Sequence, residues 1–111
     1  QTHLSDAAAV MASSELLNVH PALFDRARLA IMAHLSLAKG AVDFNTLIAE
    51  LELTRGNLST HMKKLEHDGL VRIKKAFIGR KTRTTYICTS KGKKAIQIYL
   101  SAVETVLRSS L

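Results

Sequence analysis

Residues 56–86, GNLSTHMKKLEHDGLVRIKKAFIGRKTRTTY, change their pattern twice, and this change constrains the fold more than any other feature. The first part spaces apolar residues three and four positions apart, which is typical of an amphipathic helix. After Asp68-Gly69, apolar and charged residues alternate as in a half-buried strand. Gly79 separates this strand from a second run of β-branched residues. The stretch therefore predicts a helix followed directly by a β-hairpin.

Two helices are predicted before this stretch. Ser5 and Asp6 are suited to cap a first helix over residues 5–18, because their side chains accept hydrogen bonds from free backbone N–H groups. Pro21 suits the first turn of a second helix that extends to about residue 38. Lys39-Gly40 is predicted to end it, because glycine readily adopts the left-handed C-cap conformation.

A helix-turn-helix is predicted next. Asp43 is expected to cap a short helix over residues 44–51, and Thr54 to cap a second helix that ends at His67. The narrow buried face of the second helix consists of Leu58, Met62 and Leu65. Because so short a turn joins the two helices, and the second is cationic on its outer side, the pair has the helix-turn-helix arrangement.

The hairpin and one further helix complete the order of elements. Strands are predicted over residues 70–78 and 84–89 with a cationic turn at 79–83, and Thr89 or Ser90 caps a last helix over 90–109. With 111 residues and 47% hydrophobic composition, the chain suits a single domain, residues 1–111. The predicted fold class is mainly α with a small β-hairpin (α+β): a winged helix-turn-helix with additional N- and C-terminal helices.

Positive charge is concentrated in one part of the chain. Residues 55–94 contain 12 Lys and Arg against two acidic residues, a net charge of +10, whereas the rest contains four basic and seven acidic residues. Self-repulsion destabilises such a concentration unless an anionic partner relieves it. The pattern is the electrostatic footprint of a nucleic-acid-binding protein, although a merely solubilising surface is the alternative.

The sequence also indicates where the protein acts. No apolar run approaches the roughly 20 residues that a membrane span requires, so no membrane partner is expected. The N-terminus, which begins with Gln1, lacks the basic and apolar regions of a signal peptide. The single cysteine, Cys88, excludes an internal disulfide framework and points to a reducing compartment, so a cytoplasmic protein is predicted.

Several motifs in register resemble those of winged-helix DNA-binding regulators related to the MarR group, in particular its compact subgroup. They are LTRGNLSTHMKKLEHDGLV around the second helix of the helix-turn-helix and FIGRKTRTTYICTSKGKKA across the hairpin. The similarity extends from Val19 to Leu107. It implies transcription regulation by a homodimer, usually a repressor, that binds double-stranded DNA at a pseudo-palindromic operator.

The helix over residues 55–67 is the expected recognition helix, because such helices present their N-terminal residues to base edges in the major groove. Arg55, Asn57, Ser59 and Thr60 are predicted near bases, with arginine the best reader because it bonds guanine bidentately. Gly56 would let the backbone approach DNA closely, or is simply a loose first turn. The predicted phosphate contacts are Lys63 and Lys64, and His61 is either a packing or a phosphate-contacting residue.

The wing, residues 79–84, supplies a second predicted contact. Arg80, Lys81 and Arg83 are expected at the hairpin tip, where nothing in the same chain could easily neutralise them. They would bind the DNA backbone or a narrow minor groove, unless the tip faces only solvent. A remoter role, on a solvated helix face or distant phosphates, is expected for Lys91, Lys93 and Lys94.

The terminal helices carry more apolar surface than a small core requires, and wide apolar patches mark interfaces. Pairing of these helices across a two-fold axis would bury them and place two recognition helices about one DNA turn apart. The alternative is that the first helix packs on the last within one chain. The predicted interface consists of Leu4, Ala8, Met11, Tyr99, Val103, Val106 and Leu107.

Catalysis, metal binding and cofactors find little support. The five histidines are scattered, and His61 and His67 are six residues apart, which is the wrong spacing for a shared helix face. Cys88 has no second cysteine nearby, so a thiolate metal sensor is not expected. A single-thiol redox switch is the alternative to a buried strand cysteine, which is favoured. The alternative to DNA binding is a winged-helix protein-interaction module that docks an acidic partner. RNA binding is disfavoured because no aromatic platform for stacking bases is evident.

Overall fold

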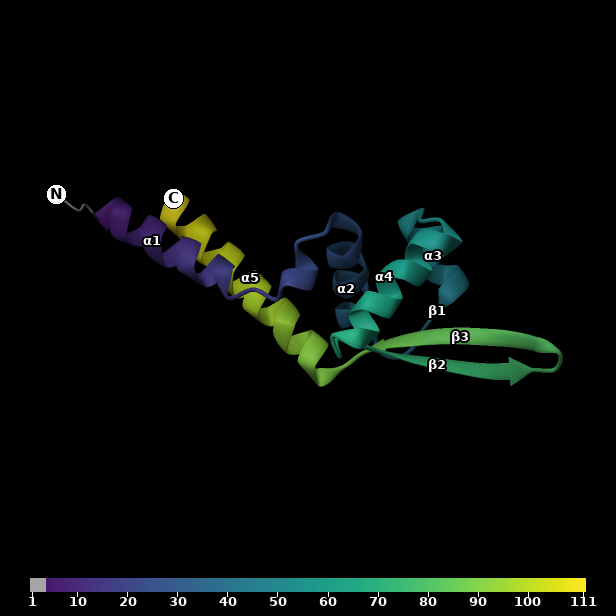
Figure 1. The fold of residues 1–111 in the computed structure, drawn as a ribbon. Helices are drawn as coiled ribbons and strands as arrows, with labels where there is room; N and C mark the ends of the chain where they lie inside the picture. Colours follow the sequence, from purple (N-terminus) through teal and green to yellow (C-terminus); the bar gives the residue numbers. More distant parts are fainter. Residues whose placement is uncertain (1–3) are drawn as a thin grey trace.

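The computed structural model describes residues 4–111, and the side chains from residue 6 onward. Its elements, in chain order, are α1 (Leu4–Leu17), the 3₁₀ turn η1 (Pro21–Leu23), α2 (Arg26–Leu37), β1 (Val42–Asp43), α3 (Phe44–Leu51), α4 (Arg55–His67), β2 (Val71–Ile78), β3 (Lys81–Cys88) and α5 (Ser90–Ser110). Figure 1 shows α2, α3 and α4 as a central body, with the β2–β3 hairpin projecting on one side and α1 and α5 on the other. The predicted winged helix-turn-helix class is confirmed.

The core lies where α2, α3 and α4 meet the base of the hairpin. Each of these helices contributes apolar side chains at three- and four-residue spacing, which places them on one face. The largest fully buried side chains are Leu23, Ile31, Met32, Leu47, Leu58, Met62, Leu65 and Leu70. The predicted inward face of α4 is therefore confirmed, and its opposite face is left for the surface.

N-terminal caps start α3, α4 and α5 where the sequence predicts them. The side chains of Asp43, Thr54 and Thr89 accept hydrogen bonds from backbone N–H groups two or three residues further on. At the end of α4, Gly69 has a φ of 77°, and Leu70 donates its N–H to the carbonyl of Leu65. This pattern is a Schellman motif, which needs glycine because an L side chain is strained at positive φ.

The predicted second helix over residues 21–38 is wrong as one element. The carboxylate of Asp25 accepts a hydrogen bond from the N–H of Arg28, so α2 begins anew after η1. The predicted left-handed cap at Gly40 is also wrong. The chain leaves α2 at Ala38 in an extended conformation, and within residues 4–111 the only glycines with positive φ are Gly69 and Gly79.

The second strand of the hairpin begins earlier, and the turn is tighter, than predicted. Strands β2 and β3 pair without interruption from Val71↔Cys88 to Ile78↔Lys81, which leaves only Gly79 and Arg80 as turn residues instead of 79–83. Gly79 supplies the positive φ, 64°, that a two-residue hairpin turn requires. The two-residue strand β1, which was not predicted, adds to β3 and gives the sheet the order β1-β3-β2.

A compact junction joins the end of α4 to the start of α5. Thr89 donates its backbone N–H to Leu70 O (3.1 Å) and its hydroxyl to Gly69 O (2.7 Å), while Lys91 Nζ donates to Asp68 O (2.7 Å). Gly92 is buried, and a Cβ built on it would lie 2.2 Å from Leu70 O. The absence of a side chain at this position therefore lets the two backbones touch.

Cys88 lies in this buried region at the end of β3. Burial raises the pKa of its thiol, so the reactive thiolate form is disfavoured. No helix in the described part of the chain has the length and hydropathy needed to cross a bilayer.

The junction generates a stability prediction. Gly92→Ala is expected to lower the free energy of unfolding by about 2–3 kcal/mol, because the added methyl group must displace the Leu70 carbonyl. Gly56→Ala is the matched control, since Gly56 also lies in the first turn of a helix and has nothing within 4 Å of its Cβ position. Urea denaturation of both variants measures the difference. Equal stability of the two would show that the junction relaxes at no cost.

Candidate nucleic-acid interface

The surface of α4 that faces away from the core carries most of the residues predicted to contact DNA. Thr54 caps the helix, and the burial of Leu58 and Leu65 fixes its rotation about its own axis. Ser59 and His61 lie half-buried at the edges of the outward face. Its exposed members are Arg55, Gly56, Asn57, Thr60, Lys63 and Lys64.

Arg55 is held in place by α3, the first helix of the helix-turn-helix. Its Nη1 donates to Asn45 Oδ1 (3.0 Å), and its guanidinium carbon lies 5.0 Å from the centroid of the Phe44 ring. Such a cation–π contact favours an ordered arginine. Phe44 and Asn45 were not predicted as site residues, although their position directly after the Asp43 cap places them in the first turn of α3, close to the start of α4.

Two further polar side chains of α4 have partners within the helix or at its end. Thr60 donates its hydroxyl to Gly56 O (3.0 Å), and Lys64 Nζ forms an ion pair with Asp68 Oδ2 (3.2 Å). Because the Lys64 side chain is 51% exposed, this ion pair contributes little stability and leaves Lys64 free to exchange partners.

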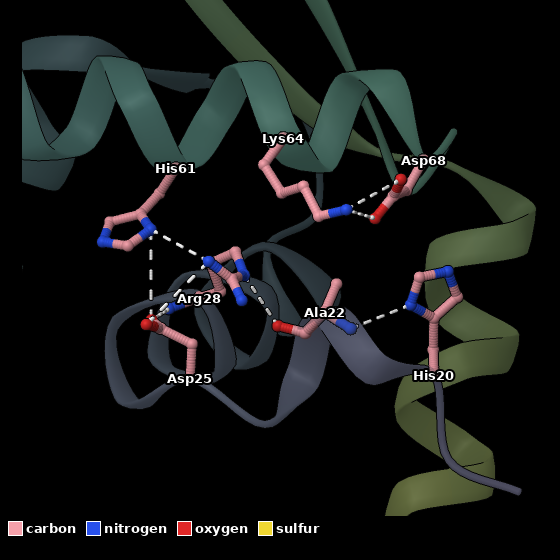
Figure 2. Close-up of polar contacts among 7 residues, drawn as sticks. All are labelled: His20, Ala22, Asp25, Arg28, His61, Lys64 and Asp68. Carbon is pink, nitrogen blue, oxygen red and sulfur yellow. Dashed lines mark hydrogen bonds and ion pairs between the residues drawn. The ribbon is translucent and has the colours of Figure 1, made fainter.

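His61 points toward the start of α2 rather than outward, as Figure 2 shows. Its Nδ1 lies 3.5 Å from Arg28 Nη1 and 3.9 Å from Asp25 Oδ1. Arg28 in turn donates from Nε to Ala22 O (2.8 Å). The backbone N–H of Arg28 and, to a lesser extent, the nearby charges of Arg28 and His61 lower the pKa of Asp25. His61 therefore packs against the start of α2, which corresponds to the first of its two predicted roles.

The wing is cationic and exposed, but one of its charges is neutralised within the chain. Arg83 Nε donates to Asp43 Oδ2 (3.0 Å), so the prediction that nothing in the same chain could neutralise the wing is wrong for Arg83. The reason is β1, which places Asp43 beside β3. Hydrogen bonding from the Asn45 N–H, with a smaller effect of Arg83, lowers the pKa of Asp43. Neither Arg80 nor Lys81 has an ion-pair partner in the described part of the chain.

A groove of about 280 Å³ separates α4 from the wing. Its walls combine several cations with neutral hydrogen-bonding groups and the single carboxylate of Asp43. The charged and polar side chains that line it are Asp43, Asn45, Arg55, Ser59, Lys63, Lys75, Thr82, Arg83 and Thr84. Lys75 was not predicted as a site residue, but its even spacing from Ile73 on β2 could have revealed it, because alternate strand residues share a face. Such a groove is suited to an anionic polymer.

The terminal helices pack against each other in one chain, yet apolar residues remain exposed. The Thr105 hydroxyl donates to Glu15 Oε2 (2.6 Å), and Ala12 and Ala102 are buried. Of the predicted interface residues, Ala8 and Tyr99 are half-buried, with Tyr99 packed on the core, and the side chain of Leu4 lies outside the described part of the chain. The exposed members are Met11 (56%), Val103 (40%), Val106 (39%) and Leu107 (59%).

Among the described residues, no three His, Cys, Asp or Glu side chains gather closely enough to hold a metal ion.

Comparisons with known proteins agree with the geometry. A family model described as a winged helix DNA-binding domain matches residues 27–107. An uncharacterized protein from Methanocaldococcus jannaschii is 43% identical over 58 residues, which cover 52% of this chain but only 63% of that protein.

Solved structures extend the comparison to most of the chain. A transcriptional regulator homologue from Pyrococcus horikoshii OT3 is 31% identical, with a TM-score of 0.76 over 88% of this chain and 95% of that one. HlyU from Vibrio cholerae N16961 is 26% identical, with a TM-score of 0.55 over 89% and 92%. A MarR-like regulator from Thermotoga maritima shares the fold at 24% identity, with a TM-score of 0.62 over 94% and 73%. The chain therefore belongs to the family of winged helix DNA-binding domains, as its motifs indicated.

Proposed function

We propose that this chain binds specific sequences in double-stranded DNA as a homodimer and, acting in the cytoplasm, represses transcription by occupying a pseudo-palindromic operator. The observation that carries the proposal is the groove between α4 and the wing. Arg55 and Lys63 line one side, and Lys75 and Arg83 line the other. Four cations converging on one groove attract a phosphate backbone and orient it along α4.

In this proposal α4 enters the major groove. Arg55, Asn57, Ser59 and Thr60 read base edges, and Lys63 and Lys64 contact phosphates. Asn45 and Phe44 support the role of Arg55, because an arginine that is already ordered loses less conformational entropy when it binds a guanine. Gly56 supports close approach of the helix, since nothing lies within 4 Å of its Cβ position.

The wing makes the second contact in this proposal. Arg80 and Lys81 approach the DNA backbone, or the minor groove next to the major groove that α4 occupies. Arg83 contributes by exchanging the carboxylate of Asp43 for a DNA phosphate, because both are anionic acceptors for the same guanidinium group.

The homodimer is proposed from the apolar residues that the α1–α5 pair leaves exposed. Val103, Val106 and Leu107 lie on α5, and Met11 lies on α1. Figure 1 shows these helices extending away from the hairpin, so their pairing with a second copy leaves both wings free. The chain is 69 Å long in its greatest extent, which lets two copies span successive half-sites about 34 Å apart.

Binding selection from a pool of random duplexes, run at two salt concentrations with the mass of each complex recorded, tests the proposal. We expect an inverted repeat bound by two chains. Recovery of only salt-labile, sequence-independent complexes would contradict specific DNA binding and would favour a module that docks an acidic protein.

The wing contact predicts an effect on salt dependence. Arg80→Ala should reduce the slope of log affinity against log salt by about one, because one phosphate contact is lost. Arg83→Ala should reduce it less, because Arg83 must first leave Asp43. Arg108→Ala is the control and should leave the slope unchanged, because Arg108 lies in the last turn of α5 and the C-terminal end of α5 is remote from the hairpin (Figure 1). Unchanged slopes for both wing variants would remove the wing from the mechanism.

The proposed dimer predicts a second effect. Val103→Glu should raise the dimer dissociation constant about a hundredfold, because a charge would be buried in an apolar contact. Leu37→Glu is the matched control, since Leu37 is an 84% exposed apolar residue on α2. Sedimentation equilibrium measures the association of both variants. A wild-type protein that is monomeric at every concentration would refute the dimer.

A further inference from the structure

The tip of the wing exposes two large apolar side chains. Phe77 is 79% exposed and Ile78 is 59% exposed, and both lie at the end of β2 next to the turn. The residues that follow, Gly79, Arg80 and Lys81, are also exposed. An apolar tip bordered by unpaired cations is costly in water, so it indicates a partner that is anionic outside and apolar within.

Strand register places the two side chains on opposite faces of the hairpin. Successive residues of a strand point to opposite sides, so Ile73, Lys75 and Phe77 share one face. Their partners on β3 are Tyr86, Thr84 and Thr82. Except for Phe77, all of these residues line the groove beside α4. Phe77 therefore continues the groove face outward, whereas Ile78 points to the other side.

The position of Phe77 relative to α4 suits a contact with the adjacent minor groove. It lies about 13 Å beyond Ile73 along β2, at the rise of an extended strand. Over this distance the groove face remains cationic, because Lys75 lies between Ile73 and Phe77. A duplex whose phosphates contact Lys63 and Lys75 would therefore also lie near the Phe77 ring.

We propose that Phe77 inserts into the minor groove and partly unstacks one base step, bending the duplex and adding a sequence preference that α4 does not supply. This inference rests on the proposed function. Apolar side chains that enter the minor groove act as wedges between base pairs and kink the duplex. Pyrimidine–purine steps unstack most easily, so the preference falls on such a step beside each half-site. Arg80 and Lys81 lie at the turn, in position to contact the phosphates that border this minor groove.

The test uses Phe77→Ala and its matched control Ile78→Ala, which removes a similar apolar group from the opposite face. Both residues are exposed, so neither change removes a core contact. Wild type and both variants are each subjected to selection from the same random duplex pool. We expect a common half-site in all three, and an enriched TA or CA step outside it for wild type and Ile78→Ala but not for Phe77→Ala. Affinity for the wild-type consensus should fall about tenfold in Phe77→Ala only.

A second measurement reports the bend directly. Energy transfer between dyes at the two ends of a 30-base-pair duplex of that consensus should rise on binding of wild type and Ile78→Ala, and should rise less with Phe77→Ala. A retained half-site with the same flanking step and the same bend in Phe77→Ala would overturn the wedge while leaving the proposed function intact. Failure of all three proteins to select any motif would overturn both.

The remaining partner with an anionic surface and an apolar interior is a lipid bilayer. Co-sedimentation with vesicles of phosphatidylcholine and phosphatidylserine tests whether the wing tip binds a bilayer instead of DNA. We expect no binding that depends on Phe77. Phe77-dependent sedimentation together with unchanged DNA selection would assign the tip to lipid and overturn the inference.

Discussion

The contact between Gly92 and the carbonyl of Leu70 is the constraint on which the arrangement of the molecule depends. A Cβ at position 92 would lie 2.2 Å from that oxygen, so the two backbones approach as closely as backbones can. The same few residues end α4, begin β2, end β3 and begin α5. The C-terminal end of α4, the base of the wing and the start of α5 are therefore fixed to one another at this junction.

Elements that depend on local chemistry could be predicted from the sequence. Caps at Asp43, Thr54 and Thr89 act within three residues, and the Asp68-Gly69 stop needs only the positive φ of glycine. Two features could not be predicted in this way. The break before α2 was hidden because apolar spacing continues across the Asp25 cap. Strand β1 exists only because β3 offers it a partner, so its two residues carry no signal of their own.

In the candidate site, too, features set by local chemistry could be predicted from the sequence, and features set by distant residues could not. The cationic face of α4 could be predicted because the buried face is clear from helical spacing, and an exposed face is its complement. The environment of each cation could not be predicted from the sequence. The partner of Arg83 lies 40 residues away in the chain, and Arg55 is oriented by Asn45 from a different helix. Charge alone identifies a surface that binds anions; only the fold shows which charges are already ordered.

The length of α5 has a mechanical consequence. Its 21 residues form a rod about 31 Å long that begins at the junction, where Thr89 and Lys91 donate hydrogen bonds to the carbonyls of Gly69 and Asp68 just after α4. A tilt of about 5° at the far end of α5, multiplied over the length of this helix, displaces α4 by about 2.7 Å, close to the length of one hydrogen bond. If two copies join through α5, any ligand or mutation that rotates α5 of one copy against α5 of the other changes the distance between the two α4 helices without contacting either of them.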